Sequence, residues 1–432
     1  MNLATPRFIL ACLLASTAAC SGGDDDAGNP GADDTSADSG SGDSSADSGS
    51  GDTSDDTSAD SGSGDASDDS SADSGSGDTS DDVGQDTEPP LDIDRPLDWP
   101  VGGSGPFLAG YRRWERTYRG PGDEADRTIG INVWYPTTEA NDEHPNYLGL
   151  GLFRDPDVYV DAPLAAPVHA GRFPVIVYSH GSQGQAGTAS DLMRHFASHG
   201  WVAVAPDHTG NLFNDNLDPR PLAMYAWRPL DVSQALDALR ELDASDPLSG
   251  KVSLDRVVMA GHSFGVYSTW GVAGATYDMA QVSSRCEAGE FADCTPERLA
   301  GFEAGFGDPR IIAAIPMGGS IGRDWFGASG HSTVTIPILA MSSSNETDQT
   351  RDQFETTAGI DMTWVDIAGG CHETFALGFC ATFNRDRGYR VVNTYAMAFA
   401  RHWLLDDSGE TTLSILAGTT PVDEAVTLAH HD

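Results

Sequence analysis

Short runs of consecutive apolar residues, separated by turn residues, recur along the chain from about residue 94 to residue 407. Such runs are typical of strands that are buried on both faces of a mostly parallel sheet. We therefore expect strands at the following ranges: Ile129–Trp134, Val175–Tyr178, Val202–Ala205, Val257–Ala260, Ile311–Ile315, Ile336–Met341 and Thr363–Ile367.

Segments with apolar residues at helical spacing alternate with these runs. The clearest lies at Pro229–Leu242, with a proline at its start, as is common for helices. Further helices are expected at Asp191–His199, after Phe264 and at Tyr389–Leu405. This alternation predicts an α/β fold with a doubly wound, mostly parallel sheet over residues 94–407. We interpret residues 408–432 as a C-terminal tail.

The composition before this domain is different. Between Ser21 and Ile93 lie 22 acidic residues and no lysine or arginine, and near-repeats of Ser-Ala-Asp-Ser-Gly-Ser-Gly-Asp recur. A segment with so few large apolar residues cannot offset the roughly 1–2 kcal/mol per residue that ordering costs. Residues 20–93 are therefore predicted to be a disordered acidic linker. The repeats lack the spaced oxygen ligands and closing glutamate of a calcium loop.

The charge of the chain excludes some classes of partner. The formal net charge is −42, and residues 94–432 hold 44 acidic against 23 basic side chains. Nucleic-acid binding needs clustered basic residues, so we expect no nucleic-acid partner. Lys251 is the only lysine, which argues against a polybasic membrane-binding patch.

The first residues have the pattern of an export signal. Arg7 precedes the apolar run Phe8–Ala15, and small residues follow, so residues 1–19 are predicted to be a signal peptide. The run is shorter than the about 20 residues that span a bilayer. The stretch Thr17–Cys20 resembles a bacterial lipobox, with threonine in place of the usual leucine. Two hypotheses stay open: Cys20 is lipidated and anchors the protein to the cell envelope, or the protein is secreted.

Four further cysteines occur in two clusters, at Cys286 and Cys294 and at Cys371 and Cys380. In an oxidising compartment this spacing favours two local disulfides, one within each cluster. No Cys-x-x-Cys spacing supports a zinc site, so no metal is expected.

The candidate nucleophile is Ser263. The predicted strand Val257–Ala260 leads directly into Gly261-His262-Ser263-Phe264-Gly265, and a helix is expected to follow. A serine on such a sharp turn needs small residues two positions before and after it. The five-residue pattern also occurs by chance in glycine-rich chains, and the strand and helix around it favour a functional serine. His262 is expected to point away from the serine and to line the core or a pocket.

The partners of such a serine follow in the order acid, then histidine. His372 lies in a glycine-rich loop after Thr363–Ile367 and is our candidate for the base. The acid is expected after Ile336–Met341, where Glu346 and Asp348 both qualify. We favour Glu346, and Asp348 stays open.

Backbone N–H groups of Phe264 and Ser182 are the candidates for an oxyanion hole. Phe264 follows the nucleophile, and Ser182 lies in the loop after Val175–Tyr178. His180 is expected to brace that loop.

Four stretches together resemble one branch of the α/β-hydrolases, which contains platelet-activating-factor acetylhydrolases and bacterial dienelactone-hydrolase-like esterases. They are residues 173–181, 228–232, 255–265 and 370–375. The resemblance implies the α/β-hydrolase fold and a serine esterase without metal or organic cofactor. It also implies small-molecule substrates, namely short acyl chains of phospholipids or other small esters.

Two positions depart from the family pattern. Val266 stands where a second glycine is common, and Glu346 stands where an aspartate would be expected. The segment Ala273–Pro309 resembles an insertion of this family, which is either a small cap over the pocket or a surface excursion. Cleavage of amides, thioesters or polyesters and a non-catalytic display or binding role remain alternatives to ester hydrolysis.

Overall fold

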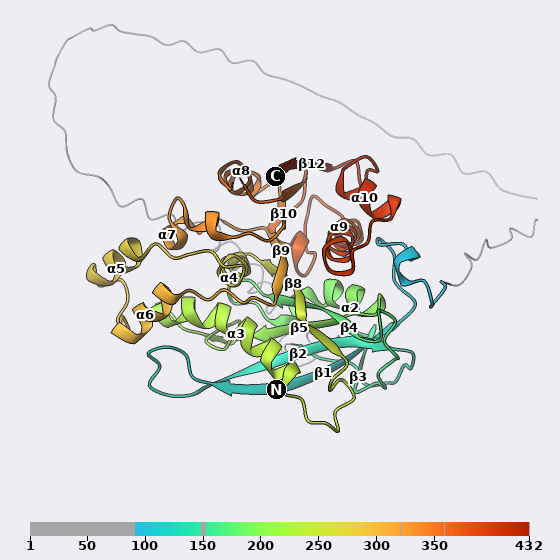
Figure 1. Cartoon of the computed structure of the whole chain (residues 1–432), viewed down its shortest axis with the longest axis horizontal. Coiled ribbons are helices and arrows are strands. Elements are labelled where there is room, and N and C mark those ends of the chain that lie inside the picture. Colours follow the sequence, from blue (N-terminus) through green and yellow to red (C-terminus); the bar gives the residue numbers. More distant parts are fainter. Residues whose placement is uncertain (1–90, 148–152, 321, 358, 432) are drawn as a thin grey trace, which may run out of the picture. The chain divides into compact units, whose positions relative to one another are not determined.

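A computed structural model describes residues 91–147, 153–320, 322–357 and 359–431. The predicted signal peptide, Cys20 and nearly all of the acidic linker lie outside these residues, so those assignments stay predictions. The described part is built on a ten-stranded sheet with the order β12-β11-β10-β9-β8-β4-β5-β2-β1-β3 (Figure 1).

The strands of this sheet are β1 (Leu108–Tyr118), β2 (Arg127–Thr137), β3 (Val158–Val160), β4 (Phe173–Ser179), β5 (Val202–Asp207), β8 (Val252–His262), β9 (Ile311–Met317), β10 (Ile338–Ser343), β11 (Met362–Ile367) and β12 (Val426–His431). A separate hairpin consists of β6 (Asn211–Leu212) and β7 (Asp215–Asn216).

The helices are α2 (Ser190–Ser198), α3 (Leu222–Arg240), α4 (Phe264–Val272), α5 (Met279–Glu287), α6 (Pro296–Ala304), α7 (Arg323–Phe326), α8 (Thr347–Thr356), α9 (Arg385–Leu405) and α10 (Glu410–Leu416). Short 3₁₀ turns are η1 (Pro96–Asp98), η2 (Ala186–Ala189), η3 (Gly330–Thr333) and η4 (His372–Phe375).

The centre of the sheet is parallel, and antiparallel pairs lie on both sides of it. Strands β5, β4, β8, β9, β10 and β11 run parallel to one another. On one side β12 pairs antiparallel with β11; on the other, β2 pairs antiparallel with both β5 and β1, and the outermost strand β3 runs parallel to β1. Every strand that the sequence predicted is present. Strand β1 was not predicted, because its second half alternates between half-buried and exposed residues and includes several charged ones.

Helices cover both faces of the sheet, and alternate strand residues supply the two cores. On β2, Ile131 and Val133 pack in the core beneath α3 and α4, while Trp134 packs in the core beneath α2 and α9. Figure 1 shows these helix pairs on opposite sides of the strands. Burial on both faces explains why the central strands appear in the sequence as continuous apolar runs.

Helix α3 begins at Leu222, seven residues before the predicted start, and Pro229 lies inside it. A proline removes one N–H from the helix, so the carbonyl of Tyr225, four residues earlier, loses its usual donor. The Tyr267 hydroxyl donates to that carbonyl at 2.8 Å. A tertiary contact from α4 therefore allows the helix to continue through the proline, which the local sequence could not indicate.

The C-terminal residues also differ from the predicted tail. Helix α10 packs against α9, and β12 pairs antiparallel with β11 from Val426 opposite Ile367 to His431 opposite Met362. The backbone of β12 satisfies the edge of β11, which would otherwise be unpaired. The folded part therefore extends at least to His431.

Both predicted disulfides are present, Cys286–Cys294 and Cys371–Cys380, with Cα–Cα distances of 5.9 and 5.5 Å. Disulfides persist in oxidising compartments, so they indicate an exported protein. Among the described residues, no helix is long and apolar enough to cross a membrane. The same residues contain no group of three or more His, Cys, Asp or Glu placed to hold a metal ion.

Candidate active site

Ser263 occupies the sharp turn between β8 and α4, at the carboxyl edge of the parallel strands. Its φ of 56° and ψ of −120° place it in a region that residues other than glycine rarely adopt. Its N–H donates to the carbonyl of Met317 on β9 at 3.0 Å, and its own carbonyl accepts from Val266 at 2.9 Å. The turn is thus held in a strained conformation by the strand and helix on either side of it.

The glycines on both sides of this serine have no room for a side chain. A Cβ at Gly261 would collide with the carbonyl of Gly265, and a Cβ at Gly265 would collide with the carbonyl of Ser179. A Cβ at Gly181 would lie 3.0 Å from the Ser263 Cβ, so the loop after β4 passes directly beside the serine. These contacts are the physical reason for the glycine spacing in the sequence.

A histidine and a carboxylate lie together at the same edge of the sheet. His372 is the first residue of η4, which follows β11, and Glu346 lies between β10 and α8. Because β10 and β11 are neighbouring parallel strands, the two loops that follow them meet at the same edge. The His372 Nδ1 and Glu346 Oε1 atoms are 2.8 Å apart. The other carboxylate oxygen of Glu346 accepts from the N–H and hydroxyl of Ser343, so this side chain is held on both oxygens.

Asp348, the alternative acid, does not take part in this arrangement. Its side chain is 93% exposed and pairs with Arg351 at 2.7 Å, one turn along α8. The Glu346 side chain is only 8% exposed. Of the two candidates, the structure therefore brings only Glu346 to His372.

His262 connects the serine turn to the histidine loop. Its Nε2 lies 3.0 Å from the carbonyl of His372, and the two rings are 4.5 Å apart between centroids. Burial, together with the charge of His372, holds the pKa of His262 well below its ordinary value. A neutral imidazole can donate from Nε2, so His262 fixes the backbone of His372 rather than acting as a base.

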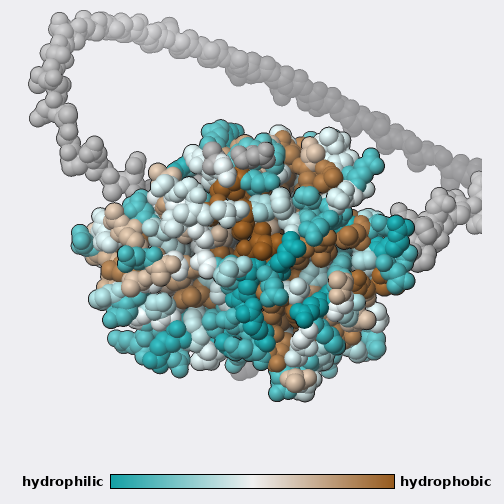
Figure 2. All heavy atoms as spheres, in the orientation of Figure 1, coloured by the Kyte–Doolittle hydropathy of each residue, from teal (hydrophilic) through white to brown (hydrophobic). Residues whose placement is uncertain are grey.

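The two oxyanion candidates adjoin the serine, since Phe264 directly follows it and Ser182 follows Gly181, which passes beside it. Phe264 is the first residue of α4, so its N–H is one of those that the helix itself leaves without a partner. Ser182 is in the loop after β4, where Gly184 N–H bonds back to the Gly181 carbonyl at 3.1 Å. On the face in Figure 2, hydrophobic residues gather around the position of α4 and β9.

A buried polar network lies beneath the loop that carries Ser182. The guanidinium of Arg228, fully buried on α3, donates to the His180 carbonyl, to Ser179 Oγ at 3.2 Å and to Asn211 Oδ1 at 2.6 Å. His180 uses Nδ1 to reach the Gly181 carbonyl at 2.7 Å. His180 therefore braces the loop, as the sequence predicted, and Arg228 supports it from below.

A second layer of this network contains His208 and Asp231. The Nε2 of His180 accepts the backbone N–H of His208 at 3.0 Å, and the His208 ring bonds Ser179 Oγ and Asp231 Oδ2, each at 2.8 Å. Arg127 pairs with the other oxygen of Asp231.

Burial dominates the electrostatics of this region. It lowers the pKa of His180 and of His208 well below the usual range, and the nearby Arg228 lowers both further. It also lowers the pKa of Arg228 to about 9 and raises that of Asp231 to about 6. Both imidazoles are therefore neutral, consistent with their acceptor roles.

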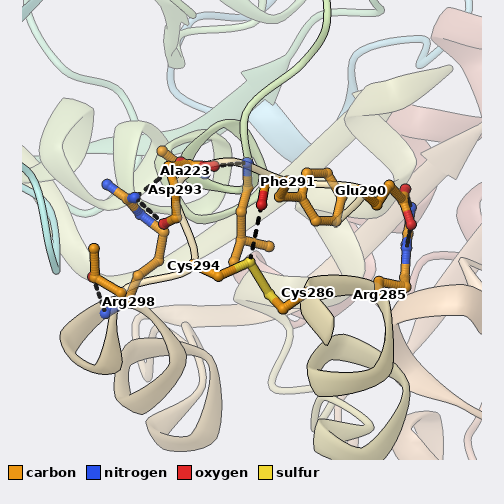
Figure 3. Close-up of a disulfide and its surroundings, with 10 residues drawn as sticks. Ala223, Arg285, Cys286, Glu290, Phe291, Asp293, Cys294 and Arg298 are labelled. Carbon is orange, nitrogen blue, oxygen red and sulfur yellow. Dashed lines mark hydrogen bonds and ion pairs between the residues drawn. A yellow bond between two sulfur atoms is a disulfide. The ribbon is translucent and has the colours of Figure 1, made fainter. Parts of the chain in front are cut away.

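The segment Ala273–Pro309 forms α5 and α6, joined by the loop that Cys286–Cys294 closes (Figure 3). Asp293 of this loop accepts the first N–H groups of α3, from Leu222 and Ala223, at 2.8 and 2.9 Å. Figure 3 shows Asp293 between α3 and Arg298, which pairs with it at 2.9 Å. The insertion therefore caps the helix that carries Arg228.

No sequence pattern assigned a role to Arg228, Asp231 or His208. The first two were visible as part of the segment 228–232 that supports the family resemblance. His208 directly follows β5, so its position at the carboxyl edge of the sheet was a usable signal.

A serine on a strained turn after β8, an acid after β10 and a histidine after β11 are the architecture of the α/β-hydrolases. Residues 160–284 match the family model described as Chlorophyllase. The solved ferulic acid esterase from Streptomyces cinnamoneus is 18% identical, with a TM-score of 0.53 over 77% of this chain and 98% of that one. No curated protein matches the chain. The structural likeness shows the α/β-hydrolase fold that the sequence predicted.

Proposed function

We propose that this protein is a serine carboxylic ester hydrolase that acts on small or short-acyl esters through an acyl-enzyme. The strongest support is the strained turn of Ser263 at the carboxyl edge of the sheet, whose neighbour His262 contacts His372, together with the His372–Glu346 pair. The esterase activity named for the solved neighbour and the match to the Chlorophyllase family model are consistent with this class.

In the proposed reaction, Ser263 Oγ attacks the ester carbonyl and His372 accepts the hydroxyl proton. Because Glu346 engages Nδ1, the proton goes to Nε2, and the carboxylate stabilises the resulting imidazolium. The N–H groups of Phe264 and Ser182 stabilise the oxyanion. The intermediate collapses as His372 returns the proton to the leaving alcohol. A water molecule then releases the acid by the same steps.

The direct test is labelling of purified protein by a fluorophosphonate, with hydrolysis of a short 4-nitrophenyl ester measured in parallel. Ser263→Ala should lose the label and roughly 10⁶-fold in kcat, because the covalent step needs the hydroxyl. Ser245→Ala, an exposed serine before β8, should retain both. An unlabelled wild-type protein would favour a non-catalytic display or binding role.

Amide, thioester or polyester cleavage would use the same groups, since this fold supports many substrates. A panel of leaving groups and chain lengths separates these reactions from ester hydrolysis. Lipidation of Cys20 remains a proposal that mass spectrometry of the envelope fraction tests.

A further inference from the structure

Arg220 stands directly beside the two candidate oxyanion residues. It lies between β7 and α3, and its Nη2 donates to Ser182 Oγ at 2.7 Å. Its guanidinium carbon lies 5.1 Å from the centre of the Phe264 ring. Because these two residues form the proposed oxyanion hole, the cation contacts the residues that would hold the carbonyl of a bound ester.

Arg220 differs from most of the described arginines in its partners. Among the described residues, none places a carboxylate oxygen within 4.0 Å of the Arg220 guanidinium, whereas most other described arginines form such a pair. The nearby Arg228 stands 4.4 Å from the same Phe264 ring and donates to neutral oxygens. Two cations thus flank one ring in a chain of formal net charge −42.

The position of Arg220 is fixed by its neighbours in the chain. Pro219 and Pro221 restrict the backbone on both sides. The following helix is capped by Asp293 of the disulfide loop, which Arg298 holds in turn (Figure 3). A preorganised cation loses little freedom when it binds an anion, so binding there is favoured.

We propose that Arg220 determines specificity by binding an anionic group, such as a carboxylate, of the ester substrate. A guanidinium has five N–H donors in a planar fork, and Ser182 engages only some of them. The remaining donors suit a carboxylate or phosphate. This inference rests on the proposed esterase function and adds the class of substrate, an ester with a negative charge close to the scissile bond.

The test compares matched neutral and anionic esters. One pair is 4-nitrophenyl hydrogen succinate and its methyl ester, which places the charge on the acyl side. A second pair is 4-acetoxybenzoate and its methyl ester, and 4-acetoxyphenyl phosphate replaces the carboxylate by a phosphate. We expect the wild type to prefer an anionic member in kcat/KM by about 10- to 100-fold, the range of a charge-assisted hydrogen bond.

Arg220→Gln should abolish this preference, mainly through a higher KM for the anionic ester, and Arg220→Lys should keep part of it. Arg172→Gln is the matched control, because Arg172 is an exposed arginine at the opposite, amino end of β4. It should retain the full preference. Thermal unfolding of each variant checks that the fold is intact.

Three results would overturn the inference. Equal losses on both members of each pair in Arg220→Gln would mean that Arg220 only braces Ser182. If the wild type hydrolyses neutral esters and shows no preference for anionic ones, the esterase function is supported but the proposed substrate class is wrong. If no ester is hydrolysed and Ser263 is not labelled, the proposed function itself fails, and the inference fails with it.

Discussion

The site around Ser263 has two parts that are built in different ways: the base side, which carries His372, and the oxyanion side, which carries Ser182. On the base side, His372 lies on a short turn after β11, its side chain is 29% exposed, and it is positioned by Glu346 and His262. On the oxyanion side, the loop of Ser182 rests on a fully buried network around Arg228. The base side therefore has few contacts and is open to solvent. On the oxyanion side, a partly exposed loop rests on many contacts between buried side chains.

This difference has a physical reason. A general base must exchange protons with substrate and water, so it needs some exposure and an imidazole whose two states are both accessible. An oxyanion hole needs only fixed donors, and a rigid support improves it at no cost in proton transfer. Substitutions on the base side should therefore affect activity more than stability, and those on the oxyanion side should affect stability as well.

Among substitutions that leave Ser263 in place, Glu346→Gln should give the largest effect on activity. Glutamine keeps the shape but removes the charge that orients and stabilises the His372 imidazolium, so kcat should fall roughly 10³–10⁴-fold. Steady-state hydrolysis of a 4-nitrophenyl ester measures this loss. Asp348→Asn is the matched control, since Asp348 is exposed and pairs only with Arg351 among the described residues, and it should stay within about twofold. If Asp348→Asn proves the crippling change, the base side has been assigned wrongly.

Arg228→Met should have the largest effect on stability. It leaves the buried His180 carbonyl and Asn211 oxygen without their donor, at a cost of about 3 kcal/mol in the free energy of unfolding. Urea denaturation measures this change. Arg240→Met, at the exposed end of the same helix, should change it by less than about 0.5 kcal/mol. A wild-type stability for Arg228→Met would mean that the network does not support the loop.

The two disulfides can be removed separately and their effects compared. They close loops of nearly equal length, with sequence separations of 8 and 9, so similar losses of stability are expected from each. Cys286→Ser/Cys294→Ser and Cys371→Ser/Cys380→Ser should each lower stability by about 2–3 kcal/mol. Only the second pair adjoins His372, so only it should lower kcat, by about tenfold. An unchanged kcat in Cys371→Ser/Cys380→Ser would show that its loop does not position the base.

The smallest effect is on the pH dependence of stability. His208 stays neutral when folded because burial depresses its pKa, whereas in the unfolded chain it takes up a proton below about pH 6.5. The folded protein therefore loses no stability to His208 protonation above that pH. As the pH falls further, the unfolded chain is stabilised by binding a proton, and the free energy of unfolding decreases. Asp231, whose pKa is raised to about 6, gives a change of the opposite sign that partly offsets it.

His208→Gln should consequently reduce the loss of stability between pH 6.5 and 5.5 by about 1 kcal/mol. Denaturation curves at constant ionic strength measure the slope for wild type and variant. An unchanged slope would mean that His208 is protonated in the folded protein.

The sequence by itself determined the layers of the fold and the positions of Ser263, His372 and the two disulfides. Strands buried on both faces leave continuous apolar runs, and the glycines at 261 and 265 are required by backbone contacts too close for any side chain. The apolar runs and the Gly-x-Ser-x-Gly pattern can each be seen in a single stretch of sequence. The contact that requires Gly265 comes from Ser179 on β4, but the glycine itself is part of the local pattern.

Only the tertiary structure decided which carboxylate meets His372, where α3 begins, and that residues 410–431 complete the sheet. It also decided that Arg220 lies beside Ser182 without a carboxylate partner among the described residues. Each of these depends on a contact between segments far apart in the chain. The free energy of such a contact is set by the partner, and the local pattern contains no record of it.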